Sequence, residues 1–92
     1  MLKLTALIGG VRSSRELAGG VYIIGRGVGC HIRIEAPDVS ERHAILTVRD
    51  GSVTIEDLHS ANGTYVNGEP VDSVVSLDGG MVVQIGENMF RV

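Results

Sequence analysis

The hydrophobic residues of this chain occur in short runs that turn-forming residues separate at close intervals along its length. Short alternating or apolar runs bounded by Gly, Asn, Asp and Pro are typical of the strands of an all-β sandwich or barrel. Ser13 and Glu16 have the spacing of a helix capping box, but Gly19 and Gly20 would end such a helix within about one turn, so we expect a strand or a loop there. The predicted strands are Val21–Gly25, His31–Ile34, Ala44–Arg49, Ser52–Asp57, Thr64–Val66, Val74–Leu77, Met81–Ile85 and Met89–Val92.

The first residues form a further alternating segment. Leu2, Leu4, Ala6 and Ile8 alternate with Lys3, Thr5 and Leu7. A signal peptide would instead have a longer continuous apolar run after its basic start. We therefore expect an edge strand at the amino end of the chain.

One hairpin is predicted by its turn sequence. Asp50-Gly51 lies between the runs Ala44–Arg49 and Ser52–Asp57. Asp-Gly is a preferred pair for a two-residue type I′ turn, because both central residues of that turn need positive φ. The segments before Ala44 and after Asp57 should then emerge at the same end of the sheet, where they can form a common binding surface.

Composition limits the classes of function. The 92 residues suit one small domain, and eight Lys and Arg against eleven Asp and Glu give a net charge of −3. With only three aromatic side chains as well, the chain lacks the basic surface and stacking rings of a nucleic-acid-binding protein. No apolar run approaches the roughly 20 residues of a membrane helix, so we expect no membrane partner.

The chain contains one cysteine, Cys30, which excludes an internal disulfide and favours a cytoplasmic location. We expect Cys30 to pack as a small buried apolar side chain. Together with the three histidines it gives no recurrent zinc-ligand spacing, so neither a metal nor another cofactor is expected.

Three motifs follow one another along the chain: Gly25-Arg26, then Ser40-Glu41-Arg42-His43, then Asn62-Gly63-Thr64. In this order and spacing they resemble the forkhead-associated (FHA) domain. The match is strongest over residues 22–71, and the resemblance extends over residues 1–92 as a single domain. It implies an eleven-stranded antiparallel β-sandwich of the SMAD/FHA type that binds phosphothreonine peptides through loops at one end.

The resemblance also implies roles for individual residues. Arg26 would contact the phosphate, Ser40 would donate its hydroxyl to a phosphate oxygen, and the Asn62 side chain would bond the peptide backbone. Glu41, Arg42 and Ala61 would line the site. Gly25, His43, Gly63 and Thr64 would support it structurally, His43 as a buried residue that braces the loops.

The chain also departs from the family pattern. Glu41 follows Ser40 where many members have Arg, Lys or Asn, and a carboxylate about 6 Å from a phosphate dianion costs roughly 1.4 kcal/mol in water. Glu41 is therefore expected to weaken generic phosphopeptide binding or to favour ligands with basic neighbours. Ala61 lacks the hydroxyl that some members have, while His31 replaces a frequent Asp and His59 a frequent Gly.

The leading interpretation is a monomeric interaction module, not an enzyme, that binds phosphothreonine-containing proteins downstream of a Ser/Thr kinase. One alternative is an FHA-fold scaffold that binds its partners without phosphate, which Glu41 supports. A second is a hydrolase that uses Ser40 and His43, although the sequence offers no oxyanion-hole motif and no third member of a triad.

Overall fold

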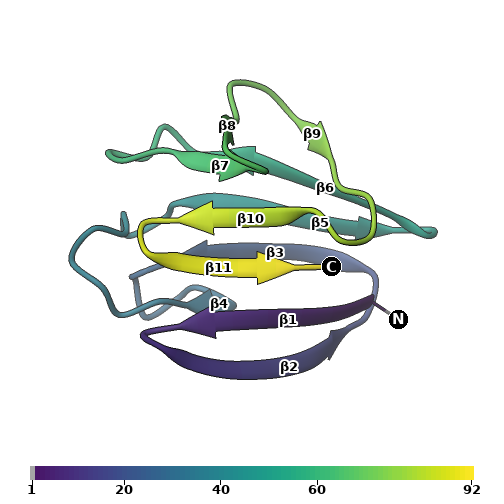
Figure 1. The fold of residues 1–92 in the computed structure, drawn as a ribbon, viewed down its shortest axis with the longest axis horizontal. Helices are drawn as coiled ribbons and strands as arrows, with labels where there is room; N and C mark the ends of the chain where they lie inside the picture. Colours follow the sequence, from purple (N-terminus) through teal and green to yellow (C-terminus); the bar gives the residue numbers. More distant parts are fainter. Residues whose placement is uncertain (1) are drawn as a thin grey trace.

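The computed structural model describes residues 2–92, and Met1, the first residue of the expected domain, lies outside them. Eleven strands form two sheets that face each other (Figure 1). The strands are β1 (Leu2–Ile8), β2 (Val11–Leu17), β3 (Gly20–Gly25), β4 (Ile32–Arg33), β5 (Ala44–Arg49), β6 (Ser52–Asp57), β7 (Thr64–Val66), β8 (Glu69–Pro70), β9 (Val75–Ser76), β10 (Val82–Ile85) and β11 (Asn88–Arg91). The expected all-β sandwich is confirmed.

The first sheet has the strand order β2-β1-β11-β10-β7-β8, and the second has the order β4-β3-β5-β6-β9. Their inward-facing side chains form one apolar core. In it, Leu46 and Ile55 of the second sheet pack together with Val83 and Phe90 of the first. All strand pairs are antiparallel except β3 and β4, which run parallel. The expected antiparallel sandwich has this one parallel pair because residues 26–31 loop back, so that Ile32 lies beside Ile24 and β4 runs in the same direction as β3.

The amino-terminal strand corrects a second expectation. β1 pairs with β2 on one side and with β11 on the other, so it is an interior strand. The edge is β2, whose side chains are exposed from Val11 to Glu16. Its polar sequence suits an edge, since charged side chains there discourage pairing with another chain.

The predicted hairpin is confirmed. β5 and β6 pair in register from Ala44 opposite Asp57 to Arg49 opposite Ser52. Asp50 has a φ of 45° and Gly51 a φ of 79°, as a type I′ turn requires. No helix occurs among residues 2–92, and therefore none that could cross a membrane.

Candidate functional site

The segments before β5 and after β6 meet at one end of the sandwich, opposite the two chain termini (Figure 1). The Leu58 amide donates to the His43 carbonyl oxygen at 2.9 Å, and Asn62 Nδ2 donates to the Asp38 carbonyl oxygen at 2.8 Å. The Ala61 amide donates to Ser40 Oγ at 3.0 Å. The hairpin therefore brings the two long loops, residues 35–43 and 58–63, onto a common surface, as expected for the segments that precede and follow an antiparallel hairpin.

His43 lies fully buried beneath this surface. Its Nδ1 accepts a hydrogen bond from the Ser40 amide at 3.1 Å, and its Nε2 lies 2.8 Å from the Gly63 carbonyl oxygen. Because Nδ1 is an acceptor and a carbonyl can only accept, the proton of the neutral ring belongs on Nε2. One imidazole thus joins both loops, and neither ring nitrogen bonds the Ser40 hydroxyl, which a nucleophile and its base would require.

Asp57 fixes the second loop from the end of β6. Its carboxylate accepts hydrogen bonds from the Ser60 amide at 3.0 Å, from the Ser60 hydroxyl, and from Thr64 Oγ1 at 2.7 Å. The Ser60 hydroxyl oxygen in turn accepts from the Gly63 amide at 2.9 Å. Burial by itself would raise the pKa of Asp57, but the hydrogen bonds from Ser60 and Thr64, with a smaller contribution from His43, hold the pKa below its ordinary value.

Arg26 follows β3 and lies against the first loop. Its amide donates to the Ser40 carbonyl oxygen at 2.9 Å, and its Nε donates to the Val39 carbonyl oxygen at 3.0 Å. Arg33 Nε donates to the Arg26 carbonyl oxygen at 3.0 Å and so holds the same residue from the other side. Within residues 2–92, no hydrogen bond or ion pair engages the two terminal nitrogens of the exposed Arg26 guanidinium.

Ser40 and Asn62 each retain hydrogen-bonding capacity. Ser40 Oγ accepts from the Ala61 amide, which leaves the hydroxyl proton available as a donor. Asn62 uses one Nδ2 proton to brace the Asp38 carbonyl, which the sequence did not indicate, and its other proton and its Oδ1 remain unbonded within the described chain. The structure therefore brings Arg26, Ser40 and Asn62 onto three adjoining segments.

Two glycines and Thr64 support this arrangement. A Cβ on Gly25 would collide with the carbonyl group of Glu41, so only glycine permits the approach of β3 to the first loop. Gly63 has a φ of 86°, which L side chains rarely adopt. Thr64 is 1% exposed and satisfies its hydroxyl on Asp57.

Glu41, Arg42 and Ala61 are all exposed. Neither Glu41 nor Arg42 forms an ion pair among the described residues, so the carboxylate of Glu41 is not neutralised by its neighbour. The Glu41 carbonyl oxygen accepts from the Gly27 amide at 3.0 Å and from the Cys30 thiol at 3.0 Å. Cys30 is only half-buried and donates this bond, which corrects the expectation that it would be a buried apolar side chain.

The other two histidines are His59 and His31. His59 has a φ of 54°, in the left-handed region that glycine occupies without strain. His31 Nδ1 accepts from the Ile23 amide at 3.0 Å, and its ring lies edge-on to Tyr22 with centroids 5.9 Å apart. The frequent Gly that His59 replaces in the family pattern is consistent with this positive φ. No grouping of three potential metal ligands occurs in residues 2–92.

Comparison with known proteins provides independent evidence on the family. The family model described as "FHA domain" matches residues 22–86. Human proliferation marker protein Ki-67 is 36% identical over 69 residues, which cover 75% of this chain and 2% of Ki-67. The glycogen accumulation regulator GarA of Mycolicibacterium smegmatis is 46% identical over 63 residues, which cover 68% of this chain and 39% of GarA. The chain thus spans well under half the length of these relatives.

A solved structure gives the same result for the fold. It comes from a structural and functional analysis of phosphothreonine-dependent FHA domain interactions. Its TM-score with this chain is 0.85 at 31% sequence identity, and the superposition covers 98% of this chain and 94% of the other. The similarity therefore includes both sheets and the loops between them.

Proposed function

The chain belongs to the FHA domain family, whose members are interaction modules, and from this premise we propose that it binds phosphothreonine-containing segments of partner proteins. Such binding would make it a reader of marks that a Ser/Thr kinase places on its partners. We further propose that residues 1–92 act as one domain and that binding, not catalysis, is its activity.

The observation that carries the proposal is the arrangement of Arg26. The bond from Nε to the Val39 carbonyl restrains the guanidinium group, while its terminal nitrogens form no hydrogen bond among residues 2–92. Two parallel N–H groups match two oxygens of a phosphate, and a lysine would provide only a point charge. The bond to Val39 therefore leaves the two terminal nitrogens of Arg26 available to donate to a phosphate.

Ser40, whose carbonyl oxygen accepts from the Arg26 amide, adds a second donor. Because Oγ accepts from the Ala61 amide, the Ser40 side chain is already held in place and loses little freedom when its hydroxyl donates to a phosphate oxygen. Asn62 lies on the facing loop, where its free N–H and Oδ1 suit the backbone of a bound peptide. A phosphate of charge about −1.5 to −2 would gain from all three groups, offset by desolvation and peptide ordering, and micromolar affinity is expected.

Titration of phosphothreonine, phosphoserine and unphosphorylated pools of one degenerate peptide library tests the proposal. We expect binding only to the phosphorylated pools, with threonine preferred if its methyl group is buried between the loops. Arg26→Ala removes two charge-assisted bonds, about 3 kcal/mol or a hundred-fold in Kd, whereas Arg26→Lys should lose about ten-fold. Arg15→Ala, on the exposed edge strand β2, is the matched control and should leave Kd unchanged.

The thermal midpoint of each variant separates a lost contact from a lost fold. Equal affinity of phosphorylated and unphosphorylated pools for a folded wild-type domain would refute the proposal. That result would favour a scaffold that binds its partners without phosphate. The unpaired, exposed carboxylate of Glu41 is the observation that supports this second candidate, since it repels a phosphate.

A further inference from the structure

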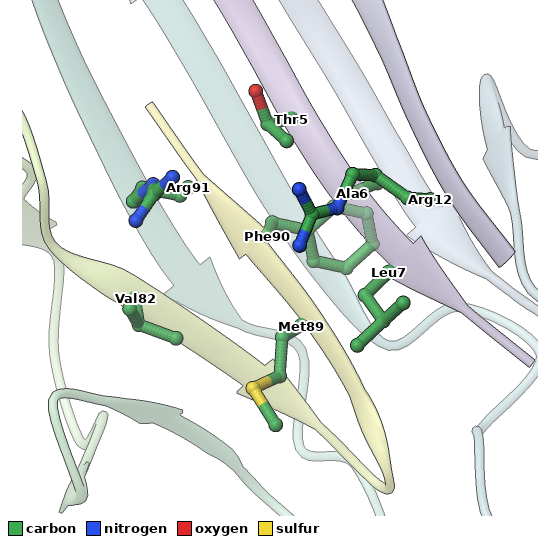
Figure 2. Close-up of a pocket in the computed structure, with 8 residues that line it drawn as sticks. All are labelled: Thr5, Ala6, Leu7, Arg12, Val82, Met89, Phe90 and Arg91. Carbon is green, nitrogen blue, oxygen red and sulfur yellow. The ribbon is translucent and has the colours of Figure 1, made fainter. Parts of the chain in front are cut away.

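The outer face of the six-stranded sheet contains a hollow that the proposed phosphopeptide loops do not use (Figure 2). It has a volume of about 170 Å³ and is open to solvent. Strands β2, β1, β11 and β10 all contribute to it, so its shape is fixed by a continuous sheet. The lining residues are Thr5, Ala6, Leu7, Arg12, Val82, Met89, Phe90 and Arg91.

Apolar side chains form one side of the hollow. Leu7 pairs across the sheet with Met89, and their side chains are 37% and 41% exposed. Val82, which pairs with Arg91, is a third apolar side chain on this face. Side chains of this kind in a concave site can be covered by an apolar side chain of a partner.

Two arginines border the same hollow. Arg12 pairs with Leu7, and Figure 2 shows its guanidinium group reaching over Ala6, while Arg91 lies on the other side of the hollow beside Val82. Among the described residues neither arginine forms an ion pair, and the lining contains no acidic side chain. The chain as a whole has a net charge of −3, so the sign of the charge is locally reversed at this hollow.

From this combination we propose that the hollow is a second docking site, for a short acidic amphipathic segment of a partner protein. An apolar side chain of the segment enters the hollow beside Leu7 and Met89, and flanking carboxylates pair with Arg12 and Arg91. Charge complementarity selects the acidic partner, because the two cations have no partners of their own. The concave shape and the two half-covered apolar side chains suit a peptide side chain better than insertion into a bilayer, which favours protruding apolar groups.

A nuclear magnetic resonance titration tests this proposal with defined probes. The first probe is a soluble, unphosphorylated peptide of Glu, Leu and Ser, the second has Lys in place of Glu, and the third has Ser in place of Leu. We expect the first peptide to shift the methyl signals of Leu7, Val82 and Met89, and the other two to shift them far less.

Charge-reversal variants test whether the two arginines bind the carboxylates of the peptide. Arg12→Glu or Arg91→Glu should weaken binding of the first peptide about five-fold or more, and the double variant should abolish it. Arg15→Glu makes the same change in net charge on the opposite face of β2 and should leave the affinity unchanged. Arg26→Ala should also leave it unchanged, so this test is independent of phosphopeptide binding.

Several results would overturn the proposal. Equal shifts with the lysine peptide, or shifts confined to residues outside the hollow, would remove the basis for an acidic segment. Methyl shifts caused by dilution of the domain alone would identify a second copy of the chain as the occupant. Stronger binding to phosphatidylserine vesicles than to the first peptide would identify a membrane surface instead.

Discussion

Replacement of Asp57 by alanine should destabilise the domain strongly, because this carboxylate organises the loop that carries Asn62. Three hydrogen bonds end on it, from the Ser60 amide, the Ser60 hydroxyl and the Thr64 hydroxyl. At about 1 kcal/mol for each bond of a half-buried carboxylate, the loss is about 3 kcal/mol. A loss of this size is a large part of the 5–15 kcal/mol by which domains are usually stable.

Urea denaturation followed by circular dichroism measures this loss. With a slope of about 1 kcal/mol per molar for a chain of this size, the midpoint of Asp57→Ala should fall by roughly 3 M. Thr64→Val tests the mechanism, since Thr64 is 1% exposed and its hydroxyl has Asp57 as its partner. Alone, Thr64→Val should cost about 1 kcal/mol, but after Asp57→Ala it removes an unsatisfied hydroxyl and should cost nothing or stabilise.

Glu56→Ala is the matched control, because Glu56 is the exposed acidic neighbour of Asp57 on the same strand. Its unfolding free energy should stay within about 0.5 kcal/mol of the wild-type value. Additive effects of Asp57→Ala and Thr64→Val would refute the reasoning, as would a loss for Asp57→Ala no larger than that of the control.

The remaining predictions concern pH, backbone geometry and charge. Because the pKa of Asp57 is lowered in the folded state, its carboxylate stabilises the fold fully above the unfolded value of 3.8. This contribution should disappear as the pH falls from there through the folded pKa. Between pH 5 and pH 3, the free energy of urea unfolding should therefore decrease less in Asp57→Asn than in wild type. Gly25→Ala should lower the free energy of unfolding by about 1–3 kcal/mol and weaken phosphopeptide binding, because the new Cβ displaces the Glu41 carbonyl. In the same urea and peptide titrations, Gly29→Ala should change neither quantity, because its Cβ meets no atom within 4 Å. His59→Gly should stabilise by about 0.5 kcal/mol, a rise of roughly 2–4 °C in Tm, because it relieves a φ of 54°; an unchanged or lower Tm would contradict this account. Glu41→Arg should tighten phosphopeptide binding by up to about ten-fold at low salt and less at high salt, and an unchanged Kd would show that the carboxylate does not act on the phosphate.

Features that depend on neighbouring residues could be predicted from the sequence. β5 and β6 have the predicted bounds, because their alternation and the Asp50-Gly51 turn are encoded within fourteen consecutive residues. Asn67 and Gly68, a pair of the kind that favours tight turns, also have positive φ. The polar segment Val11–Leu17 fits either a strand or a loop by sequence, since an edge strand needs no apolar alternation.

The candidate site divides in the same way. The order of the motifs indicated which residue types would gather, and the hairpin indicated that two of the three segments would meet. The position of Arg26 did not follow from either, because its bond to Val39 spans thirteen residues and joins segments that no hairpin connects. The second proton of Asn62 and the hydroxyl proton of Ser40 likewise became identifiable as free donors only once their other contacts were known.

The sequence by itself determined the strands with apolar alternation, the tight turns and the family motifs, because each depends on side-chain periodicity or on the φ preferences of a few adjacent residues. Tertiary structure decided that β1 is interior, that β3 and β4 run parallel, and that the imidazole of His43 joins the two loops. It also decided that Arg12 and Arg91, far apart along the chain, border one hollow. These features arise from contacts between distant segments, and such contacts depend on how the two sheets pack, which no local pattern specifies.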